Sequence, residues 1–348
     1  MKNNALGRTD LLVSDICLGT MTWGTQTTEQ DAHTQIDMAL AQGINFIDTA
    51  EMYPVTPVRA ETVGRTEEIV GSWIAKSNRR DEIVLATKIT GGNGGFCRDG
   101  EPISGAAIDR ALDGSLRRLQ TDYIDLYQLH WPNRGSYAFR QNWDFTPSKQ
   151  DTAAARAHMQ DVLASLSRHV QAGRIRHIGL SNESAWGTMM WLHLAEQMGA
   201  PRMVSVQNEY SLLFRLFDTD MAELSAHEQA GLLAYSPLAA GLLTGKYRGG
   251  ACPDGSRLSI GRNGLGGRAT PRAHAAVDAY LALAASHGLD PVHMALAFCR
   301  SRPFTTSTIC GATTVAQLKH ILAGKDLSLS DAVLKDIGAL HRAHPMPY

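Results

Sequence analysis

The sequence predicts a single α/β domain over residues 1–348, folded as a closed (β/α)8 TIM barrel. Eight short apolar runs alternate with longer amphipathic stretches, a pattern typical of buried parallel strands separated by helices. No change in composition divides the 348 residues, so one large barrel fits them better than two domains. An open, doubly wound sheet is the alternative that the same alternation permits.

The predicted strands are rich in Ile, Val and Leu and are bounded by polar residues, glycine or proline. They cover residues 15–20, 44–49, 82–88, 123–130, 175–181, 203–209, 231–237 and 307–312. Helical periodicity is clearest over residues 28–42, 104–119, 153–171, 184–198 and 273–287. The first of these helices opens at Thr28 and ends at Gly43, a residue suited to a left-handed C-terminal cap.

Other segments lie outside this alternation. Residues 4–14 precede the first parallel strand and are expected to form a hairpin that closes the barrel floor. The connections 131–152 and 241–270 are long, and such loops are usually either functional or disordered. We expect them at the C-terminal face of the barrel. Residues 327–348 are expected to form a last helix followed by a loose end.

Composition limits the class of function. Thirty-three Lys and Arg balance 34 Asp and Glu, which argues against a nucleic-acid or anionic-membrane partner. No apolar run approaches the roughly 20 residues of a membrane span, and the N-terminus does not resemble a secretory signal. The five cysteines are an odd number without zinc-ribbon spacing. We expect a cytoplasmic protein without a metal, and homo-oligomerisation stays open.

Reactive side chains stand where the predicted strands end, which is where barrel enzymes place their active sites. Asp48 ends the second strand, with Tyr53 five residues further on, and Lys88 and His130 end the third and fourth. An ammonium beside a buried tyrosine favours the phenolate, so the pKa of Tyr53 is expected to fall toward working pH. A neutral histidine can orient a carbonyl group. The set predicts protonation of an oxygen while a cofactor delivers hydride to its carbon.

Seven longer motifs extend this pattern. They are GINFIDTAEMY (43–53), LATK (85–88), DYIDLYQLHWP (122–132), GRIRHIGLSNES (173–184), VQNEYS (206–211), AYSPLAAGLLTGKY (234–247) and GATTVAQLK (311–319). Together they resemble the aldo-keto reductase superfamily over essentially the whole chain, and most of all its bacterial Tas-like NADP(H)-dependent members. The resemblance implies reversible reduction of an aldehyde or ketone to the alcohol. It makes Tyr53 the general acid, Lys88 and Asp48 its electrostatic support, and His130 the residue that orients the substrate.

The resemblance also implies an NADP(H) cofactor that lies extended in the barrel mouth. Ser181, Asn182 and Gln207 would hold the carboxamide, and Tyr235 would stack on the nicotinamide ring. The 241–270 loop carries Arg248, Arg257, Arg262 and Arg268, of which Arg257 is the expected cofactor clamp. The other implied cofactor contacts are Gly19, Thr20, Met21, Asp48, Ser236, Pro237, Leu238, Gly241, Lys246, Gly311, Thr313 and Gln317.

The adenosine end departs from the family pattern. Many relatives have an arginine where Gln317 stands and an asparagine where Ile321 stands. A guanidinium would give a 2′-phosphate a bidentate contact that an amide cannot. Gly311, Thr313 and Gln317 still fit a version that the resemblance links to NADP, so we expect NADPH, with NADH possible. Asparagine at position 321 is expected to tighten binding by giving the adenine a polar partner.

Trp23, Met52 and Trp131, with part of the 131–152 loop, are expected to line an apolar pocket for a small-molecule carbonyl substrate. Two other functions fit parts of the sequence. A nucleotide-sensing regulatory subunit, like the potassium-channel β-subunits, would share the cofactor motifs but would replace the histidine of the fourth strand. A metal-dependent barrel hydrolase or isomerase would need several ligands at strand ends, where His130 is the only histidine.

Overall fold

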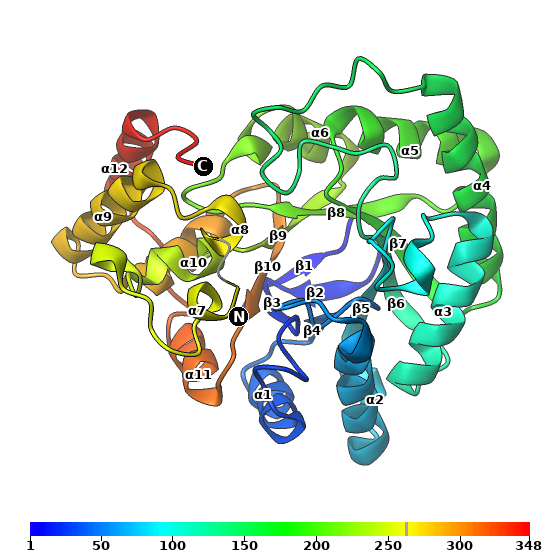
Figure 1. The fold of residues 1–348 in the computed structure, drawn as a ribbon, viewed down its shortest axis with the longest axis horizontal. Helices are drawn as coiled ribbons and strands as arrows, with labels where there is room; N and C mark the ends of the chain where they lie inside the picture. Colours follow the sequence, from blue (N-terminus) through cyan, green and yellow to red (C-terminus); the bar gives the residue numbers. More distant parts are fainter. Residues whose placement is uncertain (262–263) are drawn as a thin grey trace.

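The computed structural model describes residues 1–261 and 264–348. Its parallel strands close into a barrel in the order β10-β3-β4-β5-β6-β7-β8-β9, which confirms the predicted fold and excludes the open sheet. Helices surround these strands as an outer layer (Figure 1). The barrel strands are β3 (Ile16–Gly19), β4 (Phe46–Asp48), β5 (Val84–Ile89), β6 (Ile124–Leu129), β7 (Ile175–Ser181), β8 (Met203–Glu209), β9 (Gly231–Tyr235) and β10 (Thr305–Gly311).

The helices begin at residues whose side chains cap them. Thr28 accepts a hydrogen bond from the Asp31 amide at the start of α1, and Ser104 and Ser184 cap α3 and α5 in the same way. None of the helices in the described residues is long and apolar enough to cross a membrane. The helices are α1 (Glu29–Ala41), α2 (Arg65–Ser77), α3 (Gly105–Leu119), α4 (Thr152–Gln171), α5 (Ala185–Met198), α6 (Asp220–Glu228), α7 (Arg257–Gly261), α8 (Gly264–Gly267), α9 (Pro271–Ser286), α10 (Pro291–Ser301), α11 (Val315–Ala323) and α12 (Asp331–Ala343).

The predicted N-terminal hairpin is present and closes the barrel. Strand β1 (Asn3–Ala5) pairs antiparallel with β2 (Leu12–Ser14). Gly7 lies in their connection with φ +64°, and a Cβ there would approach the carbonyl oxygen of Val204 in β8 to 2.7 Å. Glycine therefore lets the hairpin backbone rest against the barrel. Hairpin and barrel side chains share one buried cluster, formed by Leu6, Leu11, Val13, Cys17, Phe46, Val84, Ala86, Leu126, Val204, Leu233 and Ile309.

The end of the chain is not the loose segment that the sequence predicts. Helix α12 forms as expected, but Tyr348 beyond it is only 5% exposed. Its ring stacks on Phe214 with 5.7 Å between centroids, and its hydroxyl donates to Oε1 of Glu209 over 3.2 Å. The prediction was wrong because the few residues after α12 have no periodicity of their own. Their partners come from β8, from the loop that follows it, and from Thr270 and Arg272 at the start of α9.

Both long connections contact the C-terminal ends of the strands. In the 131–152 connection, Arg134 forms an ion pair with Glu183, and Ser136 donates to the carbonyl oxygen of Asn182 over 2.8 Å. The 241–270 connection contains α7 and α8. It also carries Arg268, whose side chain makes two hydrogen bonds of 2.7 Å to the carboxylate of Glu209.

Candidate active site

The four reactive residues predicted from the strand ends lie together. Lys88 is fully buried in β5, and its Nζ lies 2.6 Å from Oδ2 of Asp48 and 3.3 Å from the hydroxyl of Tyr53. Its third hydrogen bond goes to the carbonyl oxygen of Thr49, at 2.8 Å. The ring of His130, just after β6, lies edge-on to the Tyr53 ring with centroids 5.8 Å apart. An acid, a phenol, an amine and an imidazole thus form one cluster.

Burial and charge decide the protonation of this cluster. Burial raises the pKa of Tyr53 above its ordinary value of 10, and Lys88 opposes that shift without reversing it. The expectation that Lys88 brings this pKa down toward working pH is therefore wrong for the free protein. Burial also acts to lower the pKa of Lys88, but Asp48 and Tyr53 together raise it. Burial and, second, Lys88 hold the pKa of His130 well below its ordinary value of 6.5. At neutral pH the site holds a neutral phenol, an ammonium and a neutral imidazole.

The second oxygen of Asp48 is held by two glutamines. Nε2 of Gln207 lies 2.8 Å from Oδ1, and Nε2 of Gln128 lies 3.1 Å from the same atom. Gln128, in β6, was not predicted as a site residue. The signal in the sequence is a polar side chain inside an apolar strand, two residues before His130.

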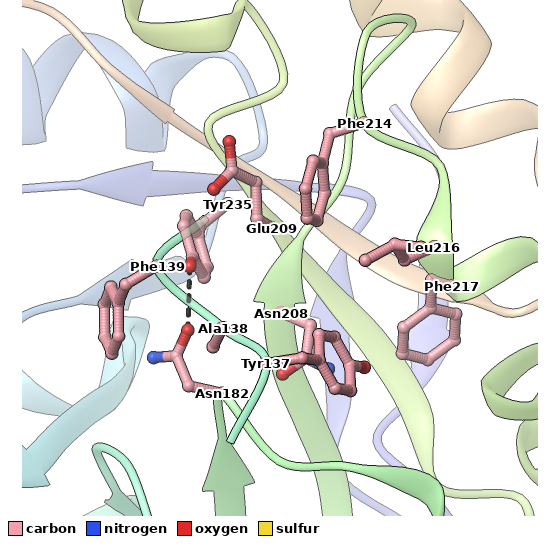
Figure 2. Close-up of a pocket in the computed structure, with 10 residues that line it drawn as sticks. All are labelled: Tyr137, Ala138, Phe139, Asn182, Asn208, Glu209, Phe214, Leu216, Phe217 and Tyr235. Atoms are coloured by element: carbon pink, nitrogen blue, oxygen red, sulfur yellow. Dashed lines mark hydrogen bonds between the residues drawn. The ribbon is translucent and has the colours of Figure 1, made fainter. Parts of the chain in front are cut away.

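The residues expected to read a carboxamide lie next to the cluster. Nδ2 of Asn182 donates to the carbonyl oxygen of His130 over 2.9 Å, and the hydroxyl of Tyr235 donates to Oδ1 of Asn182 over 2.7 Å (Figure 2). Ser181 donates to the carbonyl oxygen of Gln207 over 2.9 Å. Strands β7, β8 and β9 therefore bring all four of these predicted residues to one side of the mouth.

The ends of β3 and β10, which both carry expected cofactor contacts, are adjacent. Gly19 is the register partner of Gly311, and a Cβ on Gly19 would lie 2.8 Å from Cγ2 of Ile309. The hydroxyl of Thr20 donates to the carbonyl oxygen of Asp48 over 2.9 Å. The close approach leaves bare backbone at the end of both strands, where a ligand can come near the chain.

The turn after β9 is compact. It begins with Ser236, Pro237 and Leu238 and continues to Gly241, which has φ +94°. A Cβ on Gly241 would lie 2.9 Å from Cε of Lys246, so the lysine folds against the turn. These residues of the expected pyrophosphate contact are therefore neighbours.

At the adenosine end, part of the prediction needs correction. Gln317 and Thr313 meet at the start of α11, where Oε1 of Gln317 accepts hydrogen bonds from the Thr313 amide and hydroxyl. Ile321, in contrast, is only 5% exposed and packs in the main hydrophobic core. This burial argues against the expectation that asparagine at position 321 would contact the adenine, because the side chain belongs to the packing of α11.

The four arginines of the 241–270 loop have different surroundings. Nη2 of Arg257 reaches Sδ of Met21, 3.7 Å away across the mouth. Burial and, second, Arg268 lower the pKa of Arg257. Tyr53 is among the groups that raise it, so the Arg257 guanidinium interacts electrostatically with the phenol of the cluster. Arg248 forms an exposed ion pair with Asp278 instead. Arg268 forms a buried ion pair with Glu209. Arg262 lies outside the described residues.

The three residues expected to line the substrate pocket have different surroundings in the structure. Trp131 lies between His130 and Phe139, with ring centroids 4.8 and 5.8 Å away. A Cβ on Gly91 would lie 2.5 Å from Nε1 of Trp131, so glycine makes room for the indole. Met52 is half-buried, whereas Trp23 is fully buried in the hydrophobic core and presents no surface to the mouth.

Within residues 1–261 and 264–348, one group of side chains has the spacing of a metal site. Asp290, His293 and His320 bring one ligand atom each within 4.8 Å of the others. They lie at α10 and α11, separate from Asp48 and Lys88 in the strands and from His130 just after β6. The cluster at the strand ends consists of an ion pair, a phenol and an imidazole.

The model of the aldo/keto reductase family matches residues 15–342. The chain therefore belongs to this family of oxidoreductases. It is 46% identical to "Protein tas" of Escherichia coli (strain K12), over all of this chain and 99% of that protein, which makes it Tas-like. It is 33% identical to "Uncharacterized oxidoreductase YrpG" of Bacillus subtilis, over 96% and 94% of the two chains. It is also 28% identical to a "Probable voltage-gated potassium channel subunit beta" of Arabidopsis thaliana, over 99% and 98%.

Proposed function

We propose that this chain is an NADP(H)-dependent reductase that converts an aldehyde or ketone to the alcohol, reversibly. The observation that carries the proposal is the position of one buried ammonium, that of Lys88, between Asp48 and Tyr53. Because the phenol oxygen of Tyr53 accepts from Lys88, its own hydrogen is left for a ligand. A buried proton donor beside an ammonium can protonate the carbonyl oxygen while hydride reaches the carbonyl carbon.

The residues at the mouth fit a nicotinamide cofactor. Oε1 of Gln207 has no hydrogen-bond partner among the described residues, although the side chain is almost wholly buried, so it is available to a carboxamide. Arg257 and Lys246 would hold the phosphates, because guanidinium and ammonium groups bind such oxygens strongly. When bound, the cofactor supplies the hydride that adds to the carbonyl carbon.

The protein's own residues supply the proton that the reduced carbonyl oxygen takes up. Tyr53 would give its hydroxyl hydrogen to the oxygen that becomes an alkoxide, and Lys88 would stabilise the phenolate that remains. Asp48 keeps the ammonium of Lys88 in place through the ion pair. Neutral His130 would donate one N–H to the carbonyl oxygen and orient it. Because these hydrogen-bond donors are fixed before the reaction, they need not reorganise when negative charge develops on the carbonyl oxygen.

Aromatic rings support a substrate with an apolar or aromatic body. The rings of Tyr53, His130, Trp131 and Phe139 form a continuous series of contacts from the proposed proton donor toward the surface. Phe139 at its outer end is 41% exposed. A flat aldehyde or ketone would bury its body against this series.

A regulatory subunit that binds the cofactor with little turnover is the second candidate. Relatives named as potassium-channel β-subunits favour it, since they match this chain along its whole length. His130 favours the enzyme, because the substrate-orienting imidazole would have no use in a sensor.

Turnover tests the proposal. The purified protein is mixed with NADPH and an aromatic aldehyde, and the absorbance of the reduced nicotinamide is followed with and without a chelator. We expect aldehyde-dependent loss of absorbance that the chelator leaves unchanged, and tighter binding of NADPH than of NADH. Cofactor binding without turnover across a panel of carbonyls would favour the regulatory subunit. Absence of cofactor binding would contradict both candidates.

A further inference from the structure

The carboxylate of Asp48 determines the direction of the hydrogen bonds around it. In its ion pair with Lys88, this carboxylate only accepts hydrogen bonds. The atoms of Gln207 and Gln128 that lie 2.8 and 3.1 Å from Oδ1 must therefore be amide nitrogens. The remaining oxygen of Gln128 lies 3.2 Å from Nε2 of Gln207 and accepts the second N–H of that group.

Gln207 has no donor left as a result. An amide nitrogen carries two hydrogens, and Asp48 and Gln128 take one each. Gln128 is fully buried between these partners, so it has little freedom to turn. Gln207 offers a ligand only the acceptor Oε1.

Asn182 also offers a ligand only its amide oxygen, because both hydrogens of its Nδ2 are already donated. Its Nδ2 donates to the carbonyl oxygen of His130 over 2.9 Å and to the hydroxyl of Ser181 over 3.1 Å. Its Oδ1 already accepts from Tyr235, and a second lone pair remains. Two of the three residues expected to meet the carboxamide thus require a donor from the ligand.

We propose that Gln128 is a positioning residue that fixes Gln207 as an acceptor, and so restricts the site to nicotinamide cofactors with a free carboxamide NH2. The inference rests on the proposed function, because it needs a nicotinamide beside Gln207. A pyridine ring with an acetyl group has no donor to offer, and a ring with a carboxylate offers only charged acceptors. Either would leave Oε1 of Gln207 unpaired in a buried place.

Matched cofactors test this. NADP+ and its 3-acetylpyridine analogue differ by NH2 against CH3, and both can be titrated by quenching of tryptophan fluorescence. The wild type is expected to bind NADP+ roughly 5- to 150-fold more tightly, the range for leaving a buried acceptor unpaired. Gln128→Met keeps the length of the side chain but frees one N–H of Gln207 for the acetyl oxygen, so the ratio should fall toward one.

The control is Gln35→Met. Gln35 is a fully buried glutamine of α1 whose amide has no partner within the described residues, so its loss should leave the ratio at the wild-type value. An unchanged ratio in Gln128→Met would overturn the role of Gln128. Should that variant not fold, the wild type still decides: equal binding of NADP+ and the acetylpyridine or nicotinic-acid analogue overturns the inference. If no dinucleotide binds, the proposed function fails as well.

Discussion

Nζ of Lys88 lies 2.6 Å from Oδ2 of Asp48, and the two side chains are 0% and 3% exposed. Taking both charges out of water is unfavourable, and a buried ion pair compensates only when its remaining hydrogen-bonding groups are satisfied. Here they are. Lys88 also donates to Thr49 and Tyr53, and Asp48 accepts from two glutamines. Such pairs add little to stability compared with apolar packing, so the arrangement points to chemistry.

Tyr53→Phe is expected to lower the rate of carbonyl reduction by about 10²–10⁴-fold, the usual loss for a positioned general acid. The change removes only the phenolic oxygen, so the dissociation constant of NADPH should stay within about twofold. Steady-state rates and fluorescence titration measure the two quantities. Tyr280→Phe is the control, because Tyr280 is also buried and its hydroxyl has no partner in the described residues. Near-wild-type turnover in Tyr53→Phe would make His130 the leading proton donor.

Lys88→Met should slow reduction by a similar factor through loss of support for the phenolate. It also leaves Asp48 as an unpaired buried charge, which typically costs about 3–5 kcal/mol of folding free energy. The double variant with Tyr53→Phe should be only slightly slower than either single variant, since both disable one proton-transfer unit. Multiplicative losses would show that the two residues act separately.

The rate of reduction is expected to be level across neutral pH. Tyr53 must be protonated to donate, and burial raises its pKa above 10, so the phenol keeps its proton until the solution is more basic than that. On the acid side, burial keeps the pKa of His130 well below 6.5, so the imidazole stays neutral there. A profile of kcat/KM against pH tests both statements. A decline that begins between neutrality and pH 10 would mean that the bound cofactor lowers the pKa of Tyr53.

Arg257→Ala is expected to weaken NADPH binding by about tenfold or more, because a hydrogen bond to a charged group is worth about 1.5–3 kcal/mol. Fluorescence titration at several salt concentrations measures the loss. Arg248→Ala is the matched control from the same loop, since Arg248 pairs with exposed Asp278 over 2.8 Å and points to another partner. Equal effects of the two substitutions would indicate a general charge effect and not a clamp.

Ile321→Asn is expected to lower the free energy of unfolding by at least about 2 kcal/mol, since it removes a buried apolar side chain and buries an amide. Urea denaturation followed by circular dichroism measures the change. Lys319→Asn, at an exposed position of the same helix, should stay within about 0.5 kcal/mol of the wild type. Unchanged stability of Ile321→Asn, with tighter NADPH binding, would restore the adenine contact that the sequence suggested.

The sequence alone predicted the barrel and the four reactive residues for a local reason. Each strand is a short apolar run, and parallel strands must end at one rim. Asp48, Lys88 and His130 stand at the ends of such runs, and Tyr53 follows Asp48 by five residues. Even the hairpin 4–14 could be placed, because it precedes the first parallel strand. The expectation that asparagine at position 321 would meet the adenine did not foresee the burial of Ile321, because one position of a helix does not reveal which neighbour covers it.

What the sequence determined, then, is the order of the elements and the chemistry offered at their ends, because apolar periodicity and motifs are local. Only the tertiary structure decided how these groups act on one another. Gln128 and Gln207 stand 80 and 159 residues from Asp48 in the chain, yet both bind the same oxygen. The raised pKa of Tyr53 and the burial of Tyr348 likewise depend on desolvation by segments distant in sequence. Hydrogen-bond direction and desolvation are properties of assembled neighbours, and no local pattern carries them.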